Sequence, residues 1–421
     1  MNKQIITDPK TGMSYTKVYH PSGLTIMVME MPEFTSAYAS FGTRYGSVNT
    51  NFISDGKTVT DPLGIAHFLE HKLFENEDCD AFAKYAKTGA NANAYTSFDR
   101  TVYLFDCSSS FNESLEILLD FVQSPYFTEA SVAKEQGIID QEILMCEDSP
   151  FRKVYFNLLK AAYENHPVKY EIAGTVESIK EITADTLYRA YREFYTLSNM
   201  TLCCAGNCKL DEILEICDRL LKPTGVAAPE FVSPPEPDYP PLREYTEHMP
   251  VGLPMFSVGY KCKPATGEDL IRKEYYSGFL MDLIFGQTSR FYNEYTRKGL
   301  INSRFEFETT SGEGYFINII NGESKNPKKV LKLMNEEIAR VKREGLDEAQ
   351  FDALKKMIYG NQIRGMNSVS SCASMLLEGF MRGLDAFAPS EILKSITFRE
   401  VCDSIDELLN PEYCTISIIE Q

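Results

Sequence analysis

The segment His67-Phe68-Leu69-Glu70-His71 is the most informative stretch of this 421-residue chain. A helix turns by about 100° per residue, so His67 and His71 point to the same side and can offer two imidazole nitrogens to one metal ion. Glu70 lies beside them on the same helix. The spacing is the inverted zinc motif His-x-x-Glu-His, and it favours a zinc hydrolase over a pair of structural histidines.

The residues around the motif predict a buried helix. Asp61 followed by Pro62 is typical of a helix start, with an N-cap acceptor and a proline at the first helical position. Residues 63–74 then carry apolar side chains on nearly every side, which places the helix in the interior. Two histidines and a glutamate are costly to bury there without a partner, and a metal ion supplies one.

A catalytic zinc ion needs a third protein ligand, and residues 131–147 offer the best candidates. This segment reads as a long helix that starts near Thr128. On a helical wheel Glu135 and Glu142 lie in the middle of its apolar stripe, whereas Asp140 and Glu147 lie on the other side. Acidic residues rarely occupy such a stripe unless they are paired or bind a metal, so we expect both to point inward.

Further motifs connect these residues to a known family. The sequence Gly-Ala-Asn-Ala-Asn-Ala-Tyr-Thr-Ser at 89–97 follows the zinc motif, Thr-Val-Tyr follows at 101–103, and two glutamates seven residues apart stand on the downstream helix. With these motifs the chain resembles the M16 (insulinase or pitrilysin) metallopeptidase family, in particular its short, processing-peptidase-like bacterial members. The resemblance covers most of the chain.

The resemblance implies a role for each candidate residue. His67, His71 and Glu142 would bind Zn²⁺, and Glu70 would be the general base. Glu135 would be a second catalytic carboxylate, placed near the metal site.

Asn93 and Ala94 are the candidate substrate-binding residues. Residues 93–105 alternate in the manner of a strand. In the family this strand lies at a sheet edge and pairs with an extended substrate, and Asn93 and Ala94 contact the substrate backbone. The pattern around Asn93 also fits a core strand whose asparagine faces a helix.

Composition restricts the classes of partner and the compartment. With 42 basic and 60 acidic residues the net charge is −18, which argues against nucleic acid and anionic membranes. The eleven cysteines follow no disulfide spacing, and residues 1–10 are polar, without the apolar stretch of a signal peptide. We therefore expect a cytoplasmic protein that does not span a membrane.

The chain has one clear internal break and a sparse repeat. Residues 223–242 are rich in proline and predict an extended linker between an N-terminal zinc-binding domain, 1–222, and a homologous domain without metal, 243–421. Ile182-Thr183 and Thr201-Leu202 are echoed 214 residues later by Ile396-Thr397 and Thr415-Ile416. This offset indicates a duplicated domain, in agreement with the family.

The expected fold class is α+β, with two α/β-roll domains whose antiparallel-rich sheets carry helices on one face. Short β-rich runs predict the strands, at residues 24–31, 36–42, 256–262 and 304–321. Longer amphipathic runs predict the helices, at residues 111–123, 150–163, 327–343 and 347–363.

In the C-terminal half, residues 283–301 resemble the family's C-terminal signature, in which an arginine and a tyrosine reach the substrate carbonyl. Asn302 stands at the tyrosine position and Arg297 is the nearest arginine, so a partner subunit would have to supply the pair. Arg290 and Arg297 also fit simple surface charges.

Two functions follow from the sequence. The first is a zinc endopeptidase that cleaves oligopeptides or leader and presequence peptides inside a chamber, formed as a homo- or heterodimer with a second M16-like subunit. The second is a non-catalytic scaffold or partner-binding subunit with the same fold.

Overall fold

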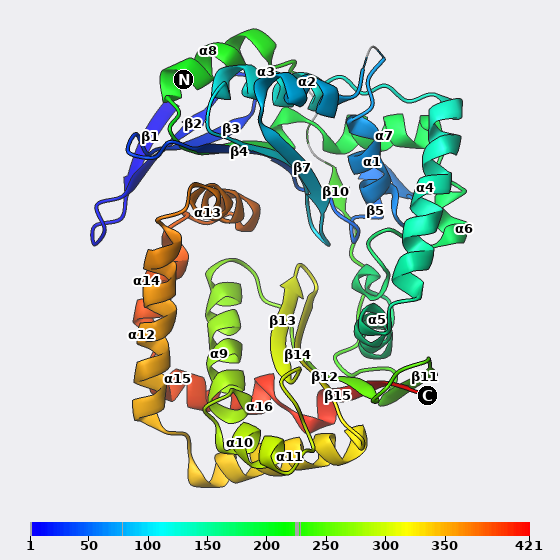
Figure 1. Ribbon diagram of the computed structural model, residues 1–421, viewed down its shortest axis with the longest axis vertical. Helices are drawn as coiled ribbons and strands as arrows, with labels where there is room; N and C mark the ends of the chain where they lie inside the picture. Colours follow the sequence, from blue (N-terminus) through cyan, green and yellow to red (C-terminus); the bar gives the residue numbers. More distant parts are fainter. Residues whose placement is uncertain (1, 78, 224–226, 228) are drawn as a thin grey trace. The chain divides into compact units, whose positions relative to one another are not determined.

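The computed structural model describes residues 2–77, 79–223, 227 and 229–421. The chain forms two compact units, which are shown in Figure 1. Unit 1 comprises Met1–Ile143, Glu171–Val232 and Gln362–Phe387, and unit 2 comprises Leu144–Tyr170, Ser233–Asn361 and Ala388–Gln421. Each unit thus contains a segment from the other half of the sequence. The predicted boundaries of two duplicated domains, 1–222 and 243–421, therefore stay a prediction. Residues 224–226 and 228 of the predicted linker lie outside the described residues.

Unit 1 is built on a seven-stranded sheet in which all neighbours are antiparallel except β3 and β9. In spatial order its strands are β1 (Asn2–Thr7), β2 (Ser14–Tyr19), β3 (Thr25–Glu30), β9 (Met200–Gly206), β4 (Ala37–Thr43), β8 (Thr101–Cys107) and β7 (Asn91–Thr96). A small sheet accompanies it, with strands β10 (Glu230–Phe231), β5 (Asn51–Ser54) and β6 (Lys57–Thr60).

The helices of unit 1 come mostly from the first half of the chain. They are α1 (Ile65–Leu73), α2 (Ala81–Thr88), α3 (Phe111–Val122), α4 (Glu129–Glu147, in unit 1 up to Ile143), α6 (Val176–Ile179), α7 (Ala184–Phe194), α8 (Leu210–Leu220) and α13 (Val369–Arg382).

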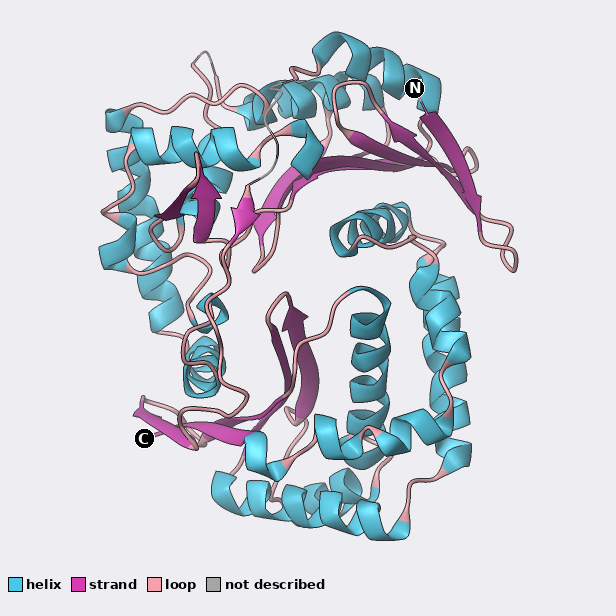
Figure 2. Cartoon of the chain, turned by 180° about the vertical axis from the view of Figure 1, so that it is seen from behind, coloured by secondary structure: helices cyan, strands magenta, loops and turns pink. Residues whose placement is uncertain are grey.

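Both faces of the seven-stranded sheet are covered, as Figure 2 also shows. Because side chains alternate along a strand, Cys204 joins the core beneath α3 and α8, whereas its neighbour Cys203 joins a second core. That second core contains Leu376 and Leu377 of α13. The α+β class is confirmed, but helices cover two faces of this sheet, because α13 comes from far along the sequence.

Unit 2 is built on a five-stranded sheet with the spatial order β11 (Glu244–His248), β15 (Cys414–Glu420), β12 (Met255–Lys261), β14 (Tyr315–Glu323) and β13 (Glu306–Gly312). Its helices are α5 (Pro150–Ala162), α9 (Gly267–Phe285), α10 (Arg290–Arg297), α11 (Pro327–Glu344), α12 (Glu348–Gly365, in unit 2 up to Asn361), α14 (Ala388–Ser395), α15 (Phe398–Asp403) and α16 (Ile405–Leu408).

The two sheets share one topology. The order β3-β9-β4-β8-β7 in unit 1 matches β11-β15-β12-β14-β13 in unit 2, and in both only the first pair is parallel. Strands β9 and β15 are offset by the 214 residues that the sequence echo indicated. Thr183 and Thr397 form capping boxes at the starts of α7 and α15. The repeat is therefore structural.

The two exchanged helices occupy equivalent places. In unit 1, α13 packs on β9 and β4, and in unit 2, α5 packs on β15 and β12, which are the matching strands. In unit 2, Leu158 of α5 approaches Gly259 so closely that a Cβ atom there would lie 3.1 Å from its side chain. Each sheet thus takes one cover helix from the other half of the chain.

The predicted elements agree with the structure. The four predicted helices correspond to α3, α5, α11 and α12, and the predicted strands correspond to β3, β4, β12 and the hairpin of β13 and β14. Within the described ranges no helix is long and apolar enough to cross a membrane. All eleven cysteines are described and all are free thiols.

The predicted linker is anchored to unit 2 by Glu236. Its carboxylate accepts hydrogen bonds from Lys261 Nζ at 2.7 Å and from the backbone amides of Glu164, Asn165 and His166 at 2.7 to 2.9 Å. Burial alone would raise the pKa of Glu236, but these donors outweigh it and lower the pKa below its ordinary value. Burial lowers the pKa of the Lys261 ammonium, and Glu236 offsets part of that effect.

We predict that Glu236→Gln destabilises the chain by about 3 kcal/mol, because it removes the ion-pair partner of the buried Lys261. Because the folded pKa of Glu236 is lowered, its contribution is present above about pH 4.5 and is lost as the pH falls through the folded pKa. Urea unfolding of the wild type and the variant at pH 7 and pH 3 measures this difference. The exposed Glu147→Gln is the control, and equal stability of the two variants at pH 7 would contradict the prediction.

Candidate metal centre

The zinc-motif helix α1 starts three residues later than its sequence suggested. Asp61 and Pro62 were predicted to cap it, but its N-cap is Gly64, with φ of +87°. Asp61 is instead buried and forms an ion pair with Arg189 of α7. A Cβ atom at Gly64 would lie 2.3 Å from the carbonyl oxygen of Ala173, so only glycine fits this turn. The expectation of a cap at Asp61 is therefore wrong.

Helix α1 lies in the interior of unit 1, as the sequence predicted. Residues Phe68, Leu69 and Leu73 are fully buried, and the helix packs on β7 and β8. His67 and His71 lie on one side of it, with their ring centroids 4.6 Å apart. The i, i+4 spacing has thus placed both imidazoles on a common face.

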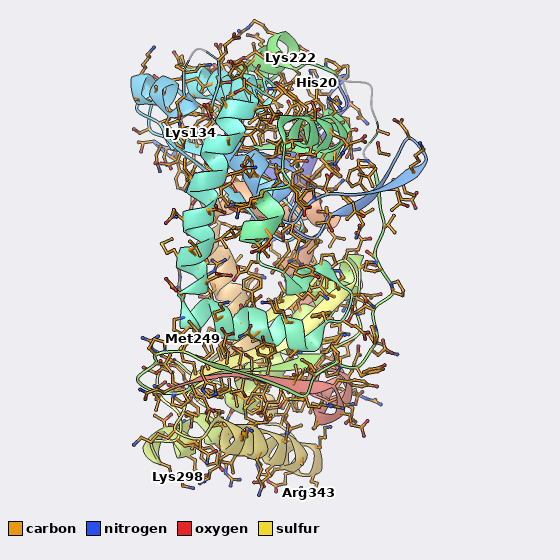
Figure 3. All side chains as sticks on the ribbon, turned by 90° about the vertical axis from the view of Figure 1, so that its right-hand side faces the viewer. His20, Lys134, Lys222, Met249, Lys298 and Arg343 are labelled. Carbon is orange, nitrogen blue, oxygen red and sulfur yellow. The ribbon has the colours of Figure 1, made fainter. Side chains whose placement is uncertain are left out.

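Helix α4 turns the two predicted glutamates toward α1. Glu135 is buried with Val132, Ile139 and Ile143, and Glu142 is half-buried. Ile138 falls on the same side of the helical wheel as Glu135, yet almost half of its surface is exposed. Lys134 projects from the outer side of the helix in Figure 3, as expected for the solvent face.

His67, His71 and Glu142 converge on one point. The Nε2 atom of His67 lies 3.6 Å from Glu142 Oε1, and the Nε2 atom of His71 lies 3.7 Å from Glu142 Oε2. One ligand atom from each residue can be chosen so that all three lie within 4.8 Å of one another. Among the described residues this is the only group of three or more histidine, cysteine or acidic side chains with such spacing.

The donor set fits a zinc ion. Ligand atoms that are each about 2.1 Å from a tetrahedral zinc ion lie about 3.4 Å apart, close to the two distances found here. Two neutral imidazoles and one carboxylate leave a fourth position for water or substrate. Because Glu70 and Glu135 add two more carboxylates beside the imidazoles, the local charge also favours a cation.

Glu135 orients His71. Its Oε1 atom lies 3.0 Å from Nδ1 of His71, so Nε2 on the other side of the ring is directed toward Glu142. Burial lowers the pKa of His71, but the Glu135 hydrogen bond and the nearby carboxylates outweigh it and raise the pKa above its ordinary value. A carboxylate behind a ligating histidine is the usual way to fix its ring and tautomer.

Glu70 lies next to the ligand group without belonging to it. Its Oε2 atom accepts a hydrogen bond of 2.6 Å from the hydroxyl of Thr96 at the end of β7. Burial raises the pKa of Glu70, and the Thr96 hydrogen bond and the charge of His71 offset part of that increase. Thr96 thus holds the Glu70 carboxylate in a fixed position beside the ligand group.

Strand β7 carries the predicted substrate residues at the edge of the sheet. It pairs with β8 on one side, and within the described chain no strand pairs with its other side. Asn93 is exposed, and its Oδ1 atom accepts a hydrogen bond of 2.9 Å from the Ala94 amide. Ala94 and Thr96 alternate with it and are more buried. The edge is therefore open to an additional strand.

Sequence reasoning did not assign a role to Thr96. The sequence did contain a pattern that bears on it, because strand alternation puts Ala94 and Thr96 on the face opposite Asn93. The structure adds that α1 packs on this strand. What the sequence did not reveal is which α1 residue the hydroxyl meets. That depends on how the helix lies across the strand.

The C-terminal candidates lie in unit 2. Asn302 donates a hydrogen bond of 2.8 Å to Glu323, and Arg290 pairs with Glu294 at 3.6 Å on the surface of α10. Arg297 is exposed at the end of the same helix. Arg290 thus behaves as a surface charge.

Comparison with known proteins gives two family matches. Residues 59–176 match the model described as insulinase (peptidase family M16), and residues 181–358 match the peptidase M16 inactive domain. The first match contains every candidate residue of the metal centre.

Three similar proteins extend the comparison. YmfH of Bacillus subtilis, named as an uncharacterised zinc protease, is 35% identical over 409 residues, which cover 95% of each chain. The bovine mitochondrial-processing peptidase subunit beta is 34% identical over 159 residues, which cover 36% of this chain and 32% of that one. The crystal structure of an M16-like chain from Alicyclobacillus acidocaldarius superimposes with a TM-score of 0.93 at 34% identity, covering 99% of each chain.

We predict that the purified chain binds about one zinc ion and that Glu142→Gln weakens this affinity by more than about 100-fold. Glu135→Gln removes only an orienting carboxylate, and its expected loss is about 10- to 100-fold. Competition with a chromophoric chelator measures both affinities. The exposed Glu129→Gln on the same helix is the control, and unchanged affinity in Glu142→Gln would exclude it as a ligand.

Proposed function

The chain belongs to peptidase family M16, and from this membership we propose that it is a zinc-dependent endopeptidase. The family and the class of enzyme are those that the sequence predicted. The observation that carries the proposal is the convergence of His67, His71 and Glu142, with Glu70 held beside them but outside the ligand set.

We assign the metal ligands to the two Nε2 atoms and the Glu142 carboxylate. A bound zinc ion would polarise the scissile carbonyl and lower the pKa of water toward about 7. Glu70 would take a proton from that water and pass it to the leaving amine. Because burial raises the pKa of Glu70, its carboxylate is a stronger base than an exposed one. Thr96 holds the carboxylate in place for both transfers.

The substrate would lie along β7 as an added strand. Asn93 and Ala94 would contact its backbone, which gives affinity through main-chain hydrogen bonds and little dependence on side chains. The open edge of β7 and the exposure of Asn93 support this assignment. We therefore propose oligopeptides, including leader or presequence peptides, as the substrate class. The net charge of −18 favours basic peptides among them.

The partner in this proposal is a second M16-like chain, identical or homologous. Two units of this fold would form half of a chamber, and a second chain would complete it. One relative supports this by name, because the bovine mitochondrial-processing peptidase beta chain is a subunit. The free thiols are compatible with the cytoplasm as its compartment.

We predict that Glu70→Gln keeps about one zinc ion per chain but lowers kcat/KM for peptide cleavage by at least about 100-fold, because the general base is lost. A quenched fluorescent peptide library and metal analysis measure the two properties. Glu129→Gln again serves as the matched control. A wild-type chain that binds zinc but cleaves no peptide would favour the scaffold function instead.

We predict that Thr96→Val lowers kcat about tenfold with KM unchanged, because the hydroxyl contacts Glu70 rather than the substrate. Thr96→Ser keeps the hydroxyl and should restore most of the rate. The exposed Thr58→Val in β6 is the control for the loss of a strand hydroxyl. A rate in Thr96→Val equal to that of the wild type would remove Thr96 from the mechanism.

We predict that the active species has at least twice the 47.7 kDa mass of one chain, because one chain forms only half of the chamber. Light scattering coupled to size exclusion, with activity assayed across the peak, measures this mass. Full activity in a monomer peak would contradict the chamber.

A further inference from the structure

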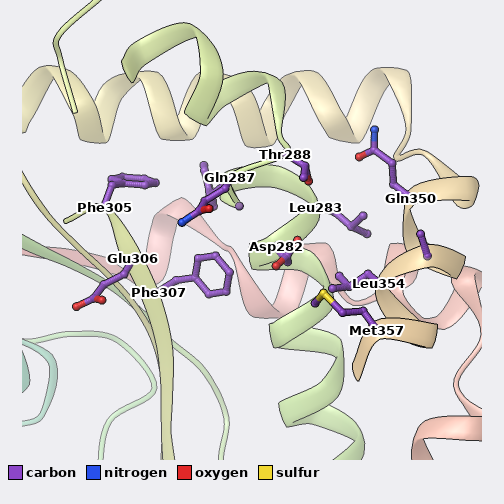
Figure 4. A pocket seen from close by; sticks show the side chains of 13 residues that line it. Asp282, Leu283, Gln287, Thr288, Phe305, Glu306, Phe307, Gln350, Leu354 and Met357 are labelled. Carbon is purple, nitrogen blue, oxygen red and sulfur yellow. The ribbon is translucent and has the colours of Figure 1, made fainter. Parts of the chain in front are cut away.

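A pocket of about 620 Å³ opens at the carboxyl end of α9 in unit 2 (Figure 4). Three pieces of the chain form its wall: the last turn of α9 with the loop after it, the start of β13, and one face of α12. Leu283, Phe307, Leu354 and Met357 supply much of its apolar surface. A cavity of this size and lining fits a small organic molecule or one side chain.

The charged side chains of the lining are all acidic. They are Asp282 and Glu306, and the lining contains no lysine, arginine or histidine. Figure 4 shows Glu306 directed to the other side of β13 from Phe307, so Asp282 is the acidic group that faces the pocket. Asp282 lies among the lining side chains in Figure 4, and burial raises its pKa. Within the described part of the chain its carboxylate forms no hydrogen bond or ion pair. A half-buried carboxylate of this kind lacks a counter-charge.

Helix α9 adds negative potential at the same place. Asp282 lies in its last turn, where the helix dipole is negative, and no basic residue stands in that turn. An acidic side chain there is unfavourable unless a cation offsets it. The helix dipole and Asp282 thus both favour a positively charged ligand.

The pocket corresponds to the metal centre of unit 1. His67-Phe68-Leu69-Glu70-His71 in α1 aligns with Gly278-Phe279-Leu280-Met281-Asp282 in α9, and each helix precedes the edge strand of its sheet, β7 or β13. Asp282 stands where His71 stands, but glycine replaces His67 and methionine replaces Glu70. Of these three positions only Asp282 keeps a side chain that could bind a metal, and much of the surrounding wall is apolar, so the cation that the pocket suits is an organic one.

We propose that this pocket binds an organic ammonium ion. The charged nitrogen lies between the Asp282 carboxylate and the ring of Phe307, which combines a charge-assisted hydrogen bond with a cation–π contact. The apolar body lies against Leu283, Leu354 and Met357. A free amine and a lysine side chain of a peptide share this chemistry.

The test is titration of the full chain with 2-phenylethylamine, followed by the ¹³C-methyl resonance of Met357, which Met357→Leu identifies. Saturable binding that shifts this resonance is expected. The neutral 2-phenylethanol and the anionic phenylacetate should bind at least about tenfold more weakly, because each lacks the charge-assisted bond. Equal binding of 2-phenylethanol, or no shift at millimolar amine, would overturn the proposal.

Variants make the assignment specific. Asp282→Asn should weaken amine binding about tenfold or more, whereas Asp352→Asn, an exposed carboxylate of α12 outside the pocket, should leave it unchanged. Unchanged binding in Asp282→Asn, or equal losses in both variants, would overturn the site. Nα-acetyl-lysine amide, titrated in parallel, distinguishes the two sources: tighter binding than the free amine indicates a peptide ligand, and weaker binding a free amine.

Discussion

Two carboxylates of α4 face two imidazoles of α1, and the rest of the metal centre depends on that contact. Glu135 lies 3.0 Å from Nδ1 of His71. The Glu142 carboxylate lies 3.6 and 3.7 Å from the Nε2 atoms of His67 and His71. Neither helix could bury these groups alone without a large cost. The two glutamates of α4 are seven residues apart and the two histidines of α1 are four apart. These spacings let the carboxylates and the imidazoles pair with one another and leave one position for a cation between the helices.

The duplicated fold places related helices in both units, and different residues on those helices give one unit the metal centre and the other a different pocket. Both sheets share strand order and direction, and a helix before the edge strand carries related residues in each. In unit 1 that helix presents His67, Glu70 and His71, whereas in unit 2 the same places hold glycine, methionine and Asp282. The exchanged helices α5 and α13 complete the two sheets at matching strands. One architecture thus supports two different chemical environments.

Local patterns predicted the elements, and long-range contacts account for what they did not predict. The spacing within α1 and α4 depends on neighbouring residues only, so the direction of His67, His71, Glu135 and Glu142 could be derived from sequence. The start of α1 could not, because Asp61 is held by Arg189, 128 residues away. The amphipathic pattern of α5 identified a helix but not the sheet that it covers, since many apolar surfaces suit the same stripe, and α13 was not predicted.

The proposed metal centre depends on one mixed ligand set, drawn from two helices. X-ray absorption at the zinc K-edge of the zinc-loaded chain examines it most directly. The account predicts a nearest shell of nitrogen and oxygen only, at about 2.0–2.2 Å, with the outer-shell scattering of two imidazoles and a carboxylate. A sulfur shell near about 2.3 Å, or a shell with one imidazole, would contradict it, because His67, His71 and Glu142 would then not hold the ion together.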